Sequence, residues 1–128
     1  MKQMETNKIE TPHYRIEFGA DRIIRFAWAP GVEVTLEIAR QSYVDTRKIV
    51  SSPPVGLLVN LGGVRNMDRD SRIFFSRLEG IAAVALVGGS PVARLIGNLF
   101  IGLNRSPMNA ARMFAAEEEA AEWLKKYL

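Results

Sequence analysis

The sequence predicts a single α/β domain with a largely parallel sheet. Two apolar runs, residues 55–61 and 81–87, are continuous enough to be strands covered on both faces, and a segment with helical periodicity separates them. A length of 128 residues suits one hydrophobic core. Because strands that alternate with helices form parallel sheets, we expect an N-terminal β-hairpin, then alternating helices and strands, in a five-stranded, mostly parallel mixed sheet.

The N-terminal part of the chain predicts a hairpin after a short lead-in. Residues 1–12 are polar and have no periodicity, so we expect a flexible lead-in before a domain that spans residues 13–128. Apolar and charged residues alternate over 14–18, which predicts a half-buried strand, and the apolar residues of 23–28 predict its antiparallel partner.

A helix is expected to follow the hairpin. Thr35 belongs to the residue types that cap helix N-termini, and apolar residues recur at helical spacing after it. Pro53 and Pro54 should end this helix, since proline disfavours α geometry at the preceding residue.

The stretch 55–80 is the one around which the rest of the chain is organised. Its strand runs into Gly62 and Gly63, which we expect to form a tight turn because glycine readily adopts a positive φ. Asp68 is the predicted N-cap of the helix that follows, and Gly80 is its predicted end.

The C-terminal third predicts two further helices and one strand. Ser90 and Pro91 have the residue types of an N-cap and a first helical position. We expect the last strand at 112–114 and the last helix at 116–127, with glutamates near its N-terminus and lysines near its C-terminus, as the helix dipole favours.

Composition narrows the class of protein. The net charge of +3 arises from 17 basic and 14 acidic residues, and no aromatic-interleaved basic stripe occurs, so nucleic-acid binding is not expected. The chain has no cysteine, which excludes disulfides and thiolate metal sites. No apolar run reaches the ~20 residues of a membrane span. We therefore expect a cytoplasmic protein without a membrane span.

Three segments carry a resemblance to a known family: LLVNLGGVRNMDRDSR, VALVGGSPVARLIGNLF and RMFAAEEEAAEWL. Over roughly residues 14–127 the chain resembles the STAS or SpoIIAA-like domain, and its second half is most similar to bacterial STAS/SEC14-like proteins of unknown function. The resemblance implies a SpoIIAA-like fold and a non-enzymatic protein-interaction or regulatory module that binds a protein partner, itself as a homodimer, or both.

The resemblance also implies where a partner binds. In anti-sigma-factor antagonists of this fold, a serine that follows Met-Asp at the start of a helix is phosphorylated. Here Arg69 and Asp70 stand where the two serines of that motif would be, and Ser71 lies one residue beyond, so its phosphorylation is left open. The implied partner-binding residues are Asp68, Arg69, Asp70, Ser71 and Arg72.

An alternative function is the binding of an anionic small ligand, such as a nucleotide or a lipid headgroup. If the two apolar strands are parallel neighbours, their ends bring helix N-termini and guanidinium groups together, and both attract anions. The candidate residues are Arg65, Arg69, Arg72, Gly88, Gly89, Ser90 and Arg94. In the other interpretation, the glycines only form turns and the arginines pair with nearby carboxylates in solvent.

The predicted helix 91–103 is more apolar than one core-facing stripe requires. The residues Ala93, Gly97 and Ile101 recur every four positions, and the two small ones would permit close approach of a second chain, so they are the candidate dimer interface. The alternative is that the N-terminal segment or the loop after residue 103 covers this side.

No arrangement of residues suggests catalysis. His13 is the only histidine, and no cysteine or carboxylate stands at ligand spacing from it. We therefore expect no catalytic residue, no metal site and no cofactor, and the protein is not expected to be an enzyme.

Overall fold

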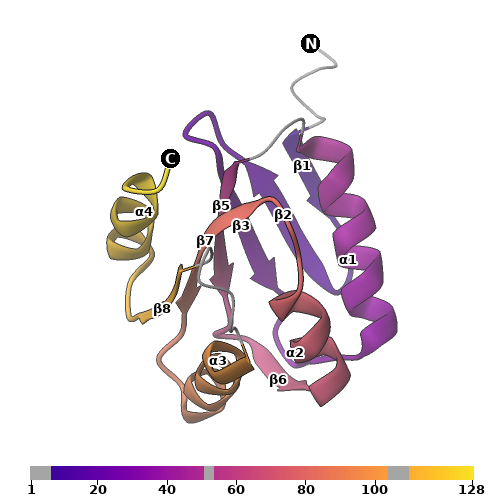
Figure 1. Ribbon diagram of the computed structural model, residues 1–128. Helices are drawn as coiled ribbons and strands as arrows, with labels where there is room; N and C mark the ends of the chain where they lie inside the picture. The colour runs from indigo at the N-terminus through magenta and orange to yellow at the C-terminus, as the bar shows by residue number, and fades with distance from the viewer. Residues whose placement is uncertain (1–6, 51–53, 104–109) are drawn as a thin grey trace.

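The computed structural model describes residues 7–50, 54–103 and 110–128, which form a three-layer α/β fold (Figure 1). The central sheet has six strands in the order β1-β2-β3-β5-β7-β8. The pairs β1–β2 and β2–β3 are antiparallel, and β3–β5, β5–β7 and β7–β8 are parallel. The strands are β1 (Lys8–Glu10), β2 (Tyr14–Phe18), β3 (Ile23–Trp28), β5 (Val55–Asn60), β7 (Ile81–Val87) and β8 (Ala110–Phe114).

The sheet contains one strand more than the five predicted. The additional strand, β1, lies within the stretch expected to be a lead-in, and Ile9 pairs there with Ile16. Its three residues are too few to show the alternation on which a strand prediction depends. The remaining order of hairpin, helices and parallel strands confirms the predicted fold class.

A second, two-stranded sheet was not predicted. The short strands β4 (Val32–Val34) and β6 (Val64–Met67) pair in parallel. The turn before β6 also differs from the prediction, because the glycines with positive φ are Gly31 and Gly80, and not Gly62 and Gly63. Gly63 is instead required by close packing: a Cβ at that position would lie 2.8 Å from Pro30 Cα.

Helices cover the two faces of the large sheet unequally (Figure 1). On one face lie α1 (Leu36–Ile49), α2 (Arg69–Ser76) and α3 (Pro91–Leu103), and on the other lies α4 (Glu117–Lys125). Each of the first three helices begins as predicted, with caps formed by Thr35, Asp68 and Ser90. The prediction that Gly80 ends α2 is wrong: the helix ends at Ser76, and Gly80 turns the chain into β7.

Two apolar clusters fill the space on either side of the sheet. The cluster under α4 is small and tight, with Ala83, Ala85 and Ala120 completely buried. The cluster under α1, α2 and α3 is larger and aromatic, and Tyr14, Phe26 and Trp28 pack there with ring centroids 4.6–5.7 Å apart. The two faces of one sheet are therefore packed in different ways.

Candidate functional site

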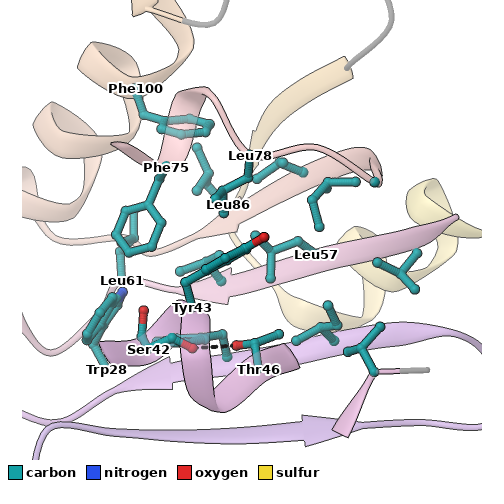
Figure 2. Close-up of a pocket in the computed structure, with 18 of the residues that line it drawn as sticks. Trp28, Ser42, Tyr43, Thr46, Leu57, Leu61, Phe75, Leu78, Leu86 and Phe100 are labelled. Atoms are coloured by element: carbon teal, nitrogen blue, oxygen red, sulfur yellow. Dashed lines mark hydrogen bonds between the residues drawn. The ribbon is translucent and has the colours of Figure 1, made fainter. Parts of the chain in front are cut away.

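A cavity of about 620 Å³ lies between the sheet and the three helices that cover its aromatic face. Its floor consists of apolar residues from the three middle strands β3, β5 and β7, among them Ile24, Leu57 and Leu86. Its roof comes from α1, α2 and α3 (Figure 2). This volume is within the range of about 300–1,000 Å³ typical of small-molecule sites.

The floor of the cavity leaves apolar surface exposed to solvent. Leu57 and Val59 belong to β5, which is hydrogen-bonded to a strand on each side. Both point to the face covered by α1, α2 and α3. Side chains in that position are normally fully buried, yet these two are only half-buried, whereas Leu58 on the opposite face is 1% exposed. The helices therefore do not close over the middle of the sheet.

One end of the cavity is closed by buried aromatic and aliphatic side chains. Trp28, Leu61 and Phe100 are each no more than 7% exposed. Figure 2 shows Phe75 of α2 above Trp28, and their ring centroids are 6.1 Å apart. This end offers apolar contacts and is sealed from solvent.

The other end of the cavity carries the polar groups. Tyr43 and Arg47 lie one turn apart on α1, and Arg47 Nη1 donates a hydrogen bond to Tyr43 Oη at 2.8 Å. Glu79, from the loop between α2 and β7, also lines the cavity, and both Arg47 and Glu79 are exposed. The hydroxyls of Ser42 and Thr46 are engaged with backbone carbonyls of α1 itself.

A buried hydrogen bond fixes α1 to the edge of this face. Tyr14 Oη of β2 donates to Asp45 Oδ2, while Lys48 and Gln41 contact the other carboxylate oxygen, each at 3.2 Å. Burial raises the pKa of Tyr14, and the bond to Asp45 raises this pKa further. Burial opposes ionisation of Asp45, but hydrogen bonds from Tyr14 and Lys48 outweigh it and lower the pKa of Asp45. This attachment holds α1 over β2, away from the middle strands.

The implied partner-binding residues lie at the start of α2. Asp68 caps the helix by accepting from the Ser71 amide at 2.8 Å, and Asp68, Arg69 and Asp70 are exposed. Ser71 is 0% exposed, and its hydroxyl bonds Asp68 Oδ1 at 2.6 Å and Val34 O at 3.2 Å. The Ser71 hydroxyl is therefore closed to a kinase in this conformation, and its side chain adds nothing to the surface of this turn.

The predicted anion-binding residues are only partly brought together. As expected, β5 and β7 are parallel neighbours, and their exits meet: a Cβ at Gly88 would lie 3.6 Å from the Gly62 amide nitrogen. Gly89 and Arg94 are exposed there, and the Ser90 hydroxyl caps α3.

Two of the four arginines of this predicted site, Arg65 and Arg72, have protein partners. Arg65 lies 3.5 Å from Glu33 of β4, and Arg72 Nη1 donates to Met67 O, while Arg72 Nε is buried without a hydrogen-bond partner among the described residues. Arg69 is exposed at the start of α2. Arg65 therefore pairs with a carboxylate, as in the interpretation without an anion, whereas Arg69 and Arg94 are exposed.

The predicted dimer residues of α3 face the protein's own sheet. Ala93 is 0% exposed, a Cβ at Gly97 would overlap Met113 Sδ of β8, and Ile101 packs against the core. The side of α3 that reaches solvent carries large apolar side chains: Val92, Leu95 and Leu99 are 42%, 60% and 42% exposed. The small side of α3, with Ala93 and Gly97, therefore packs against the domain, and its large apolar side chains face solvent.

Within residues 7–50, 54–103 and 110–128, no three histidine or acidic side chains are close enough together to hold a metal ion. His13 is exposed at the start of β2. No helix in the described part of the chain has the length and apolar character of a membrane-spanning helix.

Sequence reasoning missed the cavity. Tyr43 is half-buried on α1, and Arg47, one turn further along, is exposed. The usable signal was their spacing of four residues, which makes them neighbours on one helix face. Whether that face covers a filled core or a cavity depends on where the helix lies over the sheet, which local periodicity does not encode.

Comparisons with known proteins place the chain among proteins of unknown function. No match was found among curated proteins. An uncharacterized protein of the DUF3478 family from Shewanella loihica PV-4, described as having a SpoIIAA-like fold, superposes with a TM-score of 0.59 at 15% identity, covering 91% of this chain and 98% of that one. A protein of unknown function from Arthrobacter sp. FB24 is 28% identical over 85% of this chain and 96% of that one, with a TM-score of 0.34.

The first of these likenesses confirms the SpoIIAA-like fold expected from the sequence. The family is shown by a family model, described as "Domain of unknown function (DUF7793)", that matches residues 15–128. With nearly the whole described domain inside that match, the chain belongs to the DUF7793 family.

Proposed function

We propose that this protein is a non-enzymatic regulatory module that acts by binding an apolar small molecule in the cavity between its sheet and helices α1, α2 and α3. The observation that carries the proposal is the partly exposed apolar floor formed by Leu57 and Val59 on a middle strand. Apolar surface left open to water costs free energy, and a ligand that covers it recovers roughly 25 cal/mol per Å².

The chemistry of the lining supports binding in preference to catalysis. The titratable side chains along the cavity are Tyr43, Arg47 and Glu79, and they lie at its exposed end, away from the deep apolar part. The deep part is lined by apolar side chains, and the hydroxyls of Ser42 and Thr46 donate to backbone carbonyls of α1.

The experiment uses a neutral apolar dye, N-phenyl-1-naphthylamine, whose fluorescence rises on transfer from water to an apolar site. The unmodified protein should bind the dye saturably, with one binding site per chain. Val59→Phe fills the floor of the cavity and should abolish binding. The matched control is Val44→Phe, because Val44 is 49% exposed on α1 and lies outside the cavity lining.

Circular dichroism verifies that each variant is folded. Should Val59→Phe not fold, Val50→Phe narrows the same cavity from the α1 side. Dye binding that survives the cavity-filling variant and is lost in the Val44 variant would overturn the proposal.

A second binding function is supported by the outer side of α3. Val92, Leu95 and Leu99 expose three large apolar side chains on one helix, beside α2 with the exposed residues Asp68, Arg69 and Asp70. We propose that this surface forms a homodimer contact, continuous with the partner-binding turn that the fold family implies. Analytical ultracentrifugation should find a dimer that Leu95→Glu converts to a monomer. A monomer at all concentrations would contradict it.

A further inference from the structure

The polar end of the cavity presents hydrogen-bond donors. Arg47 Nη1 donates to Tyr43 Oη, so the phenol acts as an acceptor in this bond and its own proton remains available. Among the described residues, no carboxylate lies within ion-pair distance of Arg47, and Tyr43 Oη donates to no protein acceptor. A guanidinium group and a phenol hydroxyl that can still donate therefore lie side by side at the exposed end of the cavity.

Burial along the cavity sets the direction in which a ligand enters. Arg47 is exposed, Tyr43 and Leu57 are half-buried, and Leu61 and Phe100 are buried. Figure 2 shows Tyr43 extending from α1 across the cavity, with Leu57 on one side and Trp28 and Phe75 on the other. A molecule that follows this gradient has an apolar chain at the closed end and a polar group at Tyr43.

Charge selects the polar group. The planar guanidinium fork matches the two oxygens of a carboxylate, and a phenol can donate a further hydrogen bond to the same group. Glu79 is the competing group at the rim, since its carboxylate would attract a cation. With one guanidinium and one carboxylate near the mouth, a singly charged anion fits better than a dianion such as a phosphate monoester.

We propose that the cavity takes a single-chain carboxylic acid, with the chain against Leu57 and Leu86 and the carboxylate at Tyr43 and Arg47. This inference rests on the proposed apolar-ligand function and names the ligand class for the same site. It also assigns anion binding to Tyr43 and Arg47 of α1, in place of the arginines and glycines near Gly88 that the sequence suggested.

The test compares three ligands with the same chain and different ends: dodecanoate, dodecanol and dodecylamine, by isothermal titration calorimetry at pH 7.5 below their aggregation concentrations. Dodecanoate should bind about tenfold more tightly than dodecanol, the lower end of what hydrogen bonds to a charged group contribute. Lengthening the acid from eight to twelve carbons should tighten binding roughly fourfold per CH₂.

Four variants test which side chains bind the polar end group of the ligand. Arg47→Gln should weaken dodecanoate about tenfold and change dodecanol less than twofold, and Tyr43→Phe should weaken dodecanoate by a smaller factor. Arg40→Gln is the matched control, because Arg40 is an exposed arginine on the same helix outside the cavity lining. It should leave all three affinities unchanged, and Glu79→Gln should not weaken dodecanoate.

The failures are distinguishable. Equal affinity for dodecanoate and dodecanol in the unmodified protein would overturn the carboxylate assignment and leave apolar-ligand binding in place. Tightest binding of dodecylamine, lost in Glu79→Gln, would overturn it in favour of a cation at Glu79. If none of the three ligands binds, both the carboxylate assignment and the proposed function are wrong.

Discussion

The two faces of the central sheet use one set of strands in opposite ways. Under α4, small alanines of β7 and Leu58 of β5 allow the helix to pack close to the sheet. A Cβ at Gly56 would lie 3.4 Å from Leu124 Cδ2. Under α1, α2 and α3, larger side chains from the same strands enclose a cavity of about 620 Å³. The closed face is therefore filled by tightly packed side chains, whereas the open face combines a larger apolar cluster with a cavity.

The sharpest way to test this difference is to truncate two adjacent residues of β5. Leu58 points to the closed face and is 1% exposed, while Leu57 points to the cavity and is half-buried. Leu58→Ala should lower the free energy of unfolding by about 2–5 kcal/mol, the range for buried leucines. Leu57→Ala should cost less than half as much, since its side chain already borders empty space. Urea denaturation measures both, and equal losses would contradict the comparison.

The attachment of α1 on the open face gives the next largest effect. Tyr14→Phe removes the hydrogen bond to the buried carboxylate of Asp45 and should cost about 1.5–3 kcal/mol at pH 7. The pKa of Asp45 is lowered in the folded protein. Its contribution to the free energy of unfolding is therefore present above its unfolded-state pKa of about 3.9 and is lost as the pH falls through its folded-state pKa.

The pKa of Tyr14 is raised in the folded protein. Its contribution to the free energy of unfolding is therefore complete below its unfolded-state pKa of about 10 and is lost as the pH rises towards its folded-state pKa. The difference in unfolding free energy between the unmodified protein and Tyr14→Phe should therefore narrow below about pH 4 and again above about pH 10. Urea titrations at pH 3, 7 and 10.5 check this. A difference that does not vary with pH would contradict a stabilising hydrogen bond between Tyr14 and Asp45.

Enlarging side chains should also destabilise the closed face more than the open face. Ala85→Leu adds three carbons to the closed face, where Ala85 is 0% exposed, and should destabilise the fold by about 1–3 kcal/mol through overpacking. Val59→Leu extends into the cavity and should change stability by less than about 0.5 kcal/mol. Thermal unfolding of the two variants provides the measurement, and similar destabilisation by both would mean that the cavity is filled in solution.

The smallest effect is expected at the margin of the closed face. Arg25 Nη2 lies 3.0 Å from Asp21 Oδ2, and the hydrogen bond from Arg25 lowers the pKa of Asp21. Both side chains are about one-third exposed, so Asp21→Asn should cost less than about 1 kcal/mol, and the cost should shrink in 1 M NaCl. A loss above 2 kcal/mol would show that the hairpin turn contributes more than its ion pair.

The strands and the helix N-termini were largely predictable from the sequence, and the cavity was not. The continuous apolar strands 55–61 and 81–87, and the caps Thr35, Asp68 and Ser90, are local patterns, and each appears in the structure as expected. The cavity lies between elements that are distant in the sequence, and α1 is joined to β2 by the contact between Tyr14 and Asp45, which are 31 residues apart.

Helix α3 shows the same limit within a single element. Its apolar residues identified a buried side and a second apolar side, but not which side faces the sheet. The orientation follows from the fit of Ala93 and Gly97 against their neighbours, where a Cβ at Gly88 would lie 2.6 Å from Ala93 Cβ and one at Gly97 would overlap Met113. Such tertiary contacts decide between faces that periodicity treats as equivalent.

The most direct test of ligand binding on the open face is a filtered nuclear Overhauser experiment on the isotope-labelled protein with unlabelled dodecanoate. The account predicts contacts from the terminal methyl of the ligand to the methyl groups of Leu57, Leu61 and Leu86, and none to Leu58 on the opposite side of the same strand. Contacts confined to Leu95 and Leu99 on the outer side of α3 would contradict it.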